Sequence, residues 1–200
     1  MGRNGSGKTT LLRAALGLCS RDQGTVRFRS EVFVSPRLSD FARRGLYFLP
    51  TGESLSRGLT LRWHLEALEK EFGPSQGYDL IEPLGLRPFL DHTPFEMSGG
   101  EERKAEIALA MARNPICLLA DEPLNGIAPR DQEVVSSALR DLARAGAAVL
   151  VTGHEVRALL EMSDEVVWMV SGTTHGLGTP AEAKSHDQFR REYLGSVFHA

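Results

Sequence analysis

The chain has 200 residues, of which 42% are hydrophobic and 24% are charged, and its formal net charge is −3. This size and composition indicate a globular protein of one or two small domains and exclude a disordered chain. No long run of like charges appears, which argues against a basic surface for nucleic acid or for a membrane. The sequence also shows no signal-peptide pattern and no apolar run long enough to span a bilayer.

Cysteine and histidine usage gives no sign of a metal site. The two cysteines, Cys19 and Cys117, are far apart and each lies in an apolar stretch. This placement predicts two buried thiols in a reducing compartment and disfavours a disulfide framework. The six histidines show no ligand spacing either.

The first motif in the chain is a glycine-rich loop that begins at Gly2 and reads GRNGSGKT. It fits the pattern G-x-x-x-x-G-K-[ST], in which glycines let backbone N–H groups wrap phosphate oxygens, a lysine adds positive charge and a hydroxyl binds magnesium. Kinases, GTPases and many ATPases share this loop, so it predicts nucleotide binding without deciding the class. The residues that we expect to contact the nucleotide are Gly2, Asn4, Gly5, Ser6, Gly7, Lys8, Thr9 and Thr10.

A helical pattern follows the loop, with apolar residues at Leu11, Leu12, Ala15 and Leu16. We expect one face of this helix to pack on a sheet. A phosphate-binding loop normally connects a buried strand to a helix, and only Met1 precedes this one. We therefore expect that the chain is truncated at its N-terminus and that the strands before the loop are missing.

The next part of the chain predicts strands and then a helical insertion. Short β-branched and aromatic stretches indicate strands at 25–28, 31–34 and 46–49, separated by Gly, Ser and Pro. From 60 to 90 the apolar residues follow a helical spacing. We interpret this segment as a helical insertion.

The second half alternates between strands and helices, which is typical of a parallel sheet covered by helices. A helix that ends at Ala112 precedes an apolar strand at 116–120, and a helix at 131–145 precedes a second apolar strand at 147–152. The last elements are expected as a hairpin at 165–170 and 176–178, and as a capped helix from Thr179. The whole pattern predicts an α/β fold with a mostly parallel sheet.

Residues Ser98, Gly99, Gly100 and Glu101 precede a long helical pattern. Ser98 and Glu101 have the spacing of a capping box, so the motif can be simply a well-made helix start. It can also bind an anion, because two glycines allow close approach to the first helical N–H groups, where the helix dipole favours negative charge.

Two carboxylates, Asp121 and Glu122, follow directly after the apolar strand at 116–120. Open α/β sheets bind ligands at the carboxyl ends of their strands, which favours a site over a chance surface turn. We expect Asp121 to hold Mg²⁺ through water and Glu122 to orient and deprotonate an attacking water molecule. His154 lies just past the second apolar strand. A lone histidine is more often structural, but here it is a candidate to hydrogen-bond the γ-phosphate.

Taken together, these motifs resemble the nucleotide-binding subunit of ATP-binding cassette (ABC) transporters over nearly the whole chain. GRNGSGKTT is similar to the family's Walker A motif, MSGGE to its LSGGQ signature, ICLLADEP to its Walker B motif with the catalytic glutamate, and TGHE to its switch histidine. The GRNG segment and the FRREYLG tail are similar to the branch that contains branched-chain amino-acid importers and the lipopolysaccharide-export ATPase.

The resemblance implies a P-loop NTPase fold in one ABC domain, with a RecA-like core at 1–57 and 100–200 and a helical subdomain at 58–99. It implies an ATPase with ATP and Mg²⁺, in which Glu122 and His154 are catalytic and Thr9 and Asp121 hold the metal. It further implies a second ABC subunit, identical or different, whose signature residues Ser98 to Glu101 complete the ATP site. A transmembrane permease subunit would then hold the protein at the inner face of the cell membrane, and no nucleic acid is expected.

The sequence departs from the family pattern at two further positions. Thr51 stands where the family places a glutamine that reaches Mg²⁺, so Thr51, with Glu53 nearby, is only a possible metal contact. Ala128 stands where the family usually has an aspartate. These departures keep a second hypothesis open, an ATP-binding regulatory module with little turnover. A non-transport ABC ATPase acting on DNA or ribosomes is a third, disfavoured by the acidic charge balance and the lack of a coiled-coil insertion.

The segment after Thr51 is where the family receives its membrane subunit. Candidate contact residues are Leu55, Leu59, Leu61 and Trp63. The alternative is that these side chains form the core of the helical insertion, and this is the favoured role of Leu61 and of Leu65.

Overall fold

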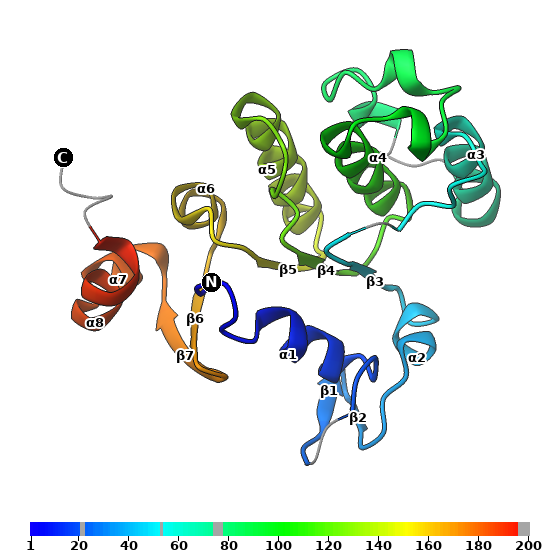
Figure 1. Ribbon diagram of the computed structural model, residues 1–200. Coiled ribbons are helices and arrows are strands. Elements are labelled where there is room, and N and C mark those ends of the chain that lie inside the picture. The colour runs from blue at the N-terminus through cyan, green and yellow to red at the C-terminus, as the bar shows by residue number, and fades with distance from the viewer. Residues whose placement is uncertain (21–22, 53, 74–77, 196–200) are drawn as a thin grey trace. The chain divides into compact units, whose positions relative to one another are not determined.

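The chain forms two compact units in its computed structural model (Figure 1). One unit comprises Met1–Pro36 and Thr152–Ala200, and the other comprises Arg37–Val151. The structure describes residues 1–20, 23–52, 54–73 and 78–195.

The first unit contains the glycine-rich loop and two antiparallel pairs of strands, β1 with β2 and β6 with β7. Its elements are α1 (Lys8–Ala15), β1 (Val26–Phe28), β2 (Glu31–Phe33), α6 (Val156–Met162), β6 (Val166–Val170), β7 (Thr173–Gly178), α7 (Pro180–Ser185), α8 (Asp187–Phe189) and a π-helical turn (Arg190–Leu194). Ser171 and Gly172 connect β6 to β7, and both have positive φ. Such a two-residue turn matches the twist of a hairpin, so the predicted closing hairpin is confirmed.

The core of this unit lies between the β6–β7 hairpin and the C-terminal helices. Trp168 on β6 meets the Phe189 ring edge-on, with 5.4 Å between the ring centroids. The Tyr193 ring stacks on the Phe189 ring, with 5.2 Å between their centroids. The predicted terminal helix begins as expected, because the Thr179 side chain accepts a hydrogen bond from Glu182 N and the Glu182 carboxylate accepts one from Thr179 N.

Met1 lies beside β6 in the manner of a strand residue. Its amino group donates to Val167 O at 2.6 Å, and its carbonyl accepts from Met169 N at 2.8 Å. Both main-chain polar groups of the residue before the glycine-rich loop are thus hydrogen-bonded to β6. These bonds hold the start of the loop beside this strand.

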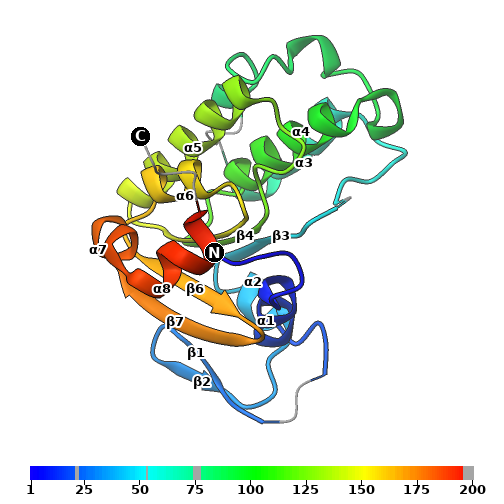
Figure 2. The same cartoon turned by 60° about the vertical axis from the view of Figure 1, so that its left-hand side comes forward.

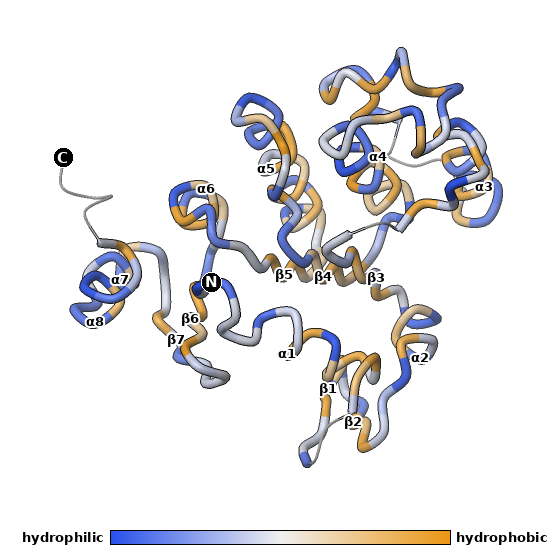
Figure 3. The backbone as a smooth tube through the Cα atoms, in the orientation of Figure 1, coloured by the Kyte–Doolittle hydropathy of each residue, from blue (hydrophilic) through white to orange (hydrophobic). Residues whose placement is uncertain are grey.

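The second unit is built on a sheet with the strand order β3-β4-β5. Strands β3 and β4 run parallel, with Leu46 opposite Cys117 and Leu49 opposite Ala120. The elements are α2 (Leu38–Ala42), β3 (Leu46–Leu49), α3 (Leu61–Phe72), three 3₁₀ turns (Tyr78–Leu80, Arg87–Phe89 and Pro94–Glu96), α4 (Gly99–Ala112), β4 (Cys117–Asp121), α5 (Pro129–Arg144) and β5, whose last residue belongs to the other unit (Ala148–Thr152). Figure 3 shows the three strands running through mostly hydrophobic residues.

Among the helices of the described residues, α4 is the most deeply buried once its first turn is left out. Every residue from 105 to 112 is buried, and the helix packs against β3, α3 and α5. The two views in Figures 1 and 2 show α4 next to α3. Apart from Glu106, the residues from 105 to 112 are apolar, as a helix buried on nearly all sides requires, which explains why the sequence lacks a simple amphipathic pattern.

The predicted α/β class with a mostly parallel sheet is confirmed. Helices α2 and α6 were not expected, because each is short and has too few residues to show a helical period. Helix α5 begins earlier than predicted, because Pro129 occupies its first turn, where a missing N–H costs nothing.

The cysteines correct a prediction: Cys19 and Cys117 are free but only half-buried. The division at residues 58 and 99 into core and helical subdomain stays a prediction.

The adjacent residues Leu11 and Leu12 of α1 give a matched test of this packing. The sequence pattern placed both on the buried face, but Leu12 is 4% exposed and Leu11 is 48% exposed. We expect Leu12→Ala to lower the free energy of unfolding by about 2–5 kcal/mol, because it opens a cavity. Leu11→Ala is expected to change it by less than about 1 kcal/mol. Urea unfolding of both variants checks this, and equal losses would contradict the placement of the helix face.

Candidate nucleotide-binding site

The glycine-rich loop needs glycine for two separate reasons. Gly5 and Gly7 have φ values of 79° and 104°, which are strained for any residue with a side chain. A Cβ atom on Gly2 would lie 2.5 Å from Met169 O and 2.6 Å from Ser6 Oγ, so no side chain fits there. The sequence motif is therefore realised as a closed loop, with Gly7 directly before the first residue of α1.

Lys8 is buried at the end of this loop. Its Nζ donates to Gly2 O at 2.9 Å and to Arg3 O at 3.3 Å. Loop carbonyls thus solvate the ammonium group, which is needed when a charge is removed from water. Burial and then the charge of Lys8 lower the pKa of the Met1 amino group to about 6. Burial, the larger cause, disfavours any charge at this position, and only the smaller contribution from the Lys8 charge favours an anion next to the loop.

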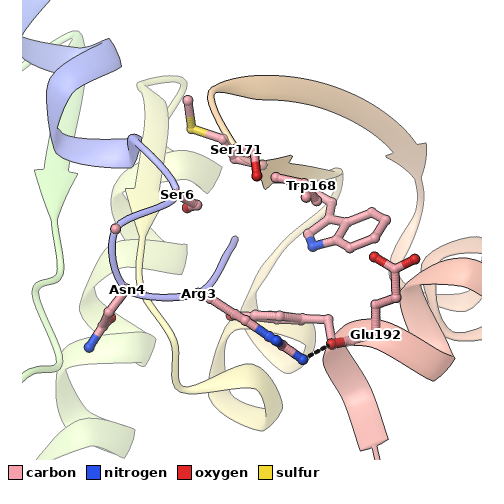
Figure 4. Close-up of a pocket in the computed structure, with 10 residues that line it drawn as sticks. Arg3, Asn4, Ser6, Trp168, Ser171 and Glu192 are labelled. Carbon is pink, nitrogen blue, oxygen red and sulfur yellow. Dashed lines mark hydrogen bonds between the residues drawn. The ribbon is translucent and has the colours of Figure 1, made fainter.

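A pocket of about 330 Å³ lies beside the loop (Figure 4). Its lining includes the loop residues Arg3 to Ser6, Trp168 and Tyr193. Arg3 Nη2 donates to Glu192 O, and Gly2 N donates to Tyr193 Oη at 3.3 Å. Ser6 Oγ is buried and makes no hydrogen bond with any of the residues that the structure describes. A buried hydroxyl without a partner is unfavourable, so Ser6 is a point at which a ligand oxygen or water would be stabilised.

The signature residues form the start of α4. Ser98 Oγ accepts from Glu101 N at 3.4 Å, and Glu101 Oε2 accepts from Ser98 N at 2.7 Å. The hydrogen bonds that the Glu101 carboxylate accepts from Ser98, first from its main-chain N–H, hold the pKa of Glu101 below its usual range. A Cβ atom on Gly100 would lie 3.0 Å from Gly126 O, whereas one on Gly99 would meet nothing. The capping-box reading of the sequence is confirmed, and the first turn of the helix leaves Ser98 and Gly99 exposed.

Asp121 ends strand β4 and is completely buried. Its Oδ2 accepts a hydrogen bond of 2.8 Å from Thr51 Oγ1, which also approaches Asp121 O at 3.4 Å. Because β3 and β4 are parallel neighbours, the residues that follow them meet at one edge of the sheet. The structure thus brings together two of the predicted metal contacts, Thr51 and Asp121. Glu53, the other candidate there, lies outside the described residues.

Glu122 follows in a left-handed conformation, with φ of 49°. This conformation is uncommon for a residue with a long side chain and requires support from its surroundings. Arg103 supplies that support, since its Nη2 donates to Asp121 O at 2.8 Å and to Glu122 O at 3.2 Å. Sequence reasoning missed Arg103. The signal available in the sequence was a pair of opposite charges, Arg103 and Glu106, at helical spacing.

His154 lies after β5, between the strand and helix α6. Its side chain is 42% exposed, and its Nε2 lies 3.6 Å from Glu155 Oε1. His154 N also donates to Glu155 Oε2 at 3.2 Å. Glu155 was not predicted as a site residue, but it orients this segment.

The predicted contact residues for a membrane subunit are only partly supported. Leu55 is buried, so its prediction as a contact is wrong, because a side chain in the core has no surface to offer. Leu61 is buried too, which confirms the core role that the sequence favoured for it. Leu65 is buried as well, as the alternative reading expected. Trp63, on the same helix, is 51% exposed. The helical spacing alone could not decide which side of this turn faces the core.

A known protein family matches this arrangement. The family profile described as ABC transporter matches residues 1–125, more than half of the chain. The chain belongs to the ABC transporter family. It is the ATP-binding subunit of such a transporter, and the family expected from the four motifs is confirmed.

Individual relatives extend over the whole chain. The lipopolysaccharide export system ATP-binding protein LptB of Haemophilus influenzae is 34% identical over 205 residues, which cover 99% of this chain and 85% of that protein. The ADP conformation of MJ1267, an ATP-binding cassette of an ABC transporter, has a TM-score of 0.78 at 23% identity, over 98% of this chain and 86% of that one. The dimeric post-hydrolysis state of the cassette MJ0796, bound to ADP and Pi, has a TM-score of 0.75 at 21% identity, over 88% and 83%. These structures show that the fold is that of an ABC ATPase.

The hydrogen bond from Thr51 to Asp121 can be tested by Thr51→Val, which keeps the side-chain shape and removes the donor. We expect the free energy of unfolding to fall by about 1–3 kcal/mol, because a fully buried carboxylate loses one of its partners. The control is Thr173→Val at an exposed position of β7. Chemical unfolding of both variants measures the difference, and a Thr51→Val chain as stable as the control would show that this bond contributes nothing.

Proposed function

We propose that this ABC subunit hydrolyses ATP and thereby drives transport through a separate membrane subunit. The observation that carries the proposal is the closed loop of residues 2–9, with a buried ammonium group at its end and a hydroxyl that lacks a partner. This arrangement suits the phosphates of a nucleotide. Asp121 and Glu122 at the end of β4 supply the acidic groups that hydrolysis requires.

Phosphate binding would use groups that the loop already presents. The first N–H groups of α1 lack partners within the helix and favour an anion. Lys8 Nζ, which donates to Gly2 O and Arg3 O, would exchange these neutral acceptors for phosphate oxygens. Charge-assisted hydrogen bonds of this kind are stronger than those to carbonyls, so the exchange favours binding.

The oxygen donors of Thr9 and Asp121 fit Mg²⁺, which prefers hard oxygen ligands and few protein carboxylates. We propose that these donors hold the ion together with the nucleotide. No group of three His, Cys, Asp or Glu side chains that suits a metal occurs among the described residues. When bound, Mg²⁺ neutralises charge on the phosphates. Thr51 would act beside it by holding the Asp121 carboxylate through the 2.8 Å hydrogen bond.

Glu122 would accept a proton from the attacking water while the water oxygen forms a bond to the γ-phosphorus. The bond from that phosphorus to the bridging oxygen breaks, and ADP and phosphate leave. His154 would donate a hydrogen bond to the γ-phosphate and so stabilise the charge that develops there. Catalysis in this class consists mainly of positioning and electrostatic stabilisation.

A second ABC subunit would complete the site. Ser98 and Gly99 are exposed at the start of a helix of 14 residues, where N–H groups and the helix dipole favour phosphate. We propose that these residues, with Gly100 and Glu101, face the nucleotide held by the loop of a partner cassette. The related cassette MJ0796 forms a dimer in its post-hydrolysis state bound to ADP and Pi, which is consistent with this arrangement.

The membrane subunit would be a separate chain. Within the described residues, no helix combines the length and apolar character needed to cross a bilayer. We propose that the protein sits at the inner face of the cell membrane through its permease partner, with Trp63 as a contact. Similarity to LptB makes a lipopolysaccharide exporter one candidate for the assembly.

One observation favours the alternative of a regulatory module with little turnover. Thr51 takes the place of the family's glutamine, and its hydroxyl donates directly to Asp121. That bond occupies an oxygen of the carboxylate assigned to Mg²⁺. Mg²⁺-dependent ATP hydrolysis by the purified chain, measured before and after chelation with EDTA, separates the two hypotheses, because a regulatory module binds ATP without releasing phosphate.

Two substitutions separate binding from chemistry. Lys8→Ala is expected to weaken ATP binding about 10- to 100-fold, because a charge-assisted contact worth about 1.5–3 kcal/mol is lost. Glu122→Gln is expected to keep ATP binding and to lower turnover about 100- to 10,000-fold, because the proton acceptor is removed. Calorimetry and phosphate release measure the two effects.

The matched control for Glu122→Gln is Glu161→Gln. Glu161 lies on helix α6, is 59% exposed and pairs with Arg157 at the surface. We expect this variant to turn over like the parent chain. Turnover of Glu122→Gln at the rate of the parent would refute the assigned role of Glu122.

A further inference from the structure

The second unit contains a buried ion pair on helix α4 that the proposed reaction does not use directly. Arg103 Nη1 lies 2.8 Å from Glu106 Oε2, and the two side chains are only 8% and 3% exposed. Burial of two charges is costly, and the cost is offset only when the remaining donors and acceptors are also satisfied. The partners of this pair therefore reveal what it holds in place.

Arg103 donates to three main-chain carbonyls as well as to Glu106. Nη1 donates to Pro50 O at 2.8 Å, directly after β3. Nη2 donates to Asp121 O at 2.8 Å and to Glu122 O at 3.2 Å, which belong to the last residue of β4 and the residue after it. The planar fork of one guanidinium group thus joins the ends of two neighbouring strands.

Glu106 extends this connection to the segment after β3. Its Oε1 accepts from Ser54 N at 2.6 Å and from Ser54 Oγ at 2.7 Å. Its Oε2 accepts a hydrogen bond from Arg103 Nη1, so both oxygens of the carboxylate have partners. Removing Glu106 would leave the guanidinium charge buried and free to turn away from the strand ends.

We propose that Arg103, oriented by Glu106, is a positioning residue that holds Glu122 in its left-handed conformation. This inference rests on the proposed function, in which Glu122 accepts a proton from water. Glu122 has φ of 49°, and its carbonyl is held by Arg103 on one side and accepts from Asn125 N at 3.2 Å. Without the guanidinium group the turn relaxes, and the carboxylate moves away from its working position.

The turn is also tied to the signature residues through α4. Ser98 caps this helix, and Arg103 lies in its second turn. A displacement of the helix start therefore reaches Glu122 through a rigid element and a buried ion pair. A lysine in place of Arg103 keeps the charge but presents a single nitrogen, which cannot serve both strand ends in one plane.

The test compares Arg103→Lys with Arg113→Lys. Arg113 is the C-cap residue that follows α4, and its guanidinium lies over the rings of Tyr47 and Phe72, 5.2 and 4.4 Å from their centroids. The same chemical change is therefore made at a site that does not contact Asp121 or Glu122. The full chain is used, with MgATP as the probe.

We expect Arg103→Lys to lower kcat about 10- to 100-fold and to leave the ATP dissociation constant within about threefold of the parent value, because misplacement of a reacting group by about 1 Å has effects of this size. Amide hydrogen exchange at Asn125 should become at least about tenfold faster, because its acceptor, the carbonyl of Glu122, is released. Arg113→Lys should change neither quantity. Parental kcat and parental exchange in Arg103→Lys would overturn the inference.

Glu106→Gln provides a second variant should Arg103→Lys fail to fold. Glutamine retains an acceptor for Ser54 but removes the charge that orients Arg103. We expect a loss of kcat of about three- to tenfold and faster exchange at Asn125. Unchanged values of both would equally overturn the inference.

The two proposals fail in different ways. A parent chain that binds ATP without turnover refutes the proposed hydrolysis, but exchange at Asn125 still reports whether Arg103 holds the turn. A parent chain that hydrolyses ATP, with an Arg103→Lys variant of equal kcat and exchange, refutes only the positioning role.

Discussion

The buried ion pair between Arg103 and Glu106 is the constraint on which the acidic end of the sheet depends. Two charges that are nearly excluded from water must satisfy one another, and removal of one partner from such a pair typically costs about 3–5 kcal/mol. Here the remaining hydrogen-bonding capacity is directed at Pro50, Ser54 and the Asp121–Glu122 turn. The hydrogen bonds that stabilise the buried pair therefore also hold the segments that follow β3 and β4.

The parallel pairing of β3 and β4 explains why these groups can be joined by one side chain. Parallel neighbours end at the same edge of a sheet, so the residues after Leu49 and those after Ala120 lie close together. Helix α4 packs against β3 and presents Arg103 to that edge. Apart from Glu106, the residues from 105 to 112 are apolar, which allows the helix to be buried this deeply. Core packing and site geometry are therefore parts of one arrangement.

The glycine-rich loop shows a related principle in the other unit. Its backbone is closed by positive φ angles at Gly5 and Gly7 and by close contact at Gly2, and the loop carbonyls solvate the Lys8 ammonium group. A cation held in this way is ready to change partners without a large rearrangement. Such preorganisation is the main contribution that a protein makes to phosphate chemistry.

The sequence by itself determined the local structures and the family. The spacing of GRNGSGKT, the capping box at Ser98 and Glu101, and the apolar strand before Asp121 are local patterns with direct physical causes, and the structure contains each of them. The tertiary structure decided which side chains meet. It placed Thr51 on Asp121, exposed Leu11 and Trp63 while burying Leu55 and Leu61, and gave Arg103 its three carbonyl partners. These outcomes depend on contacts between residues that lie far apart in the chain. A periodic pattern in the sequence does not specify which distant residues come into contact.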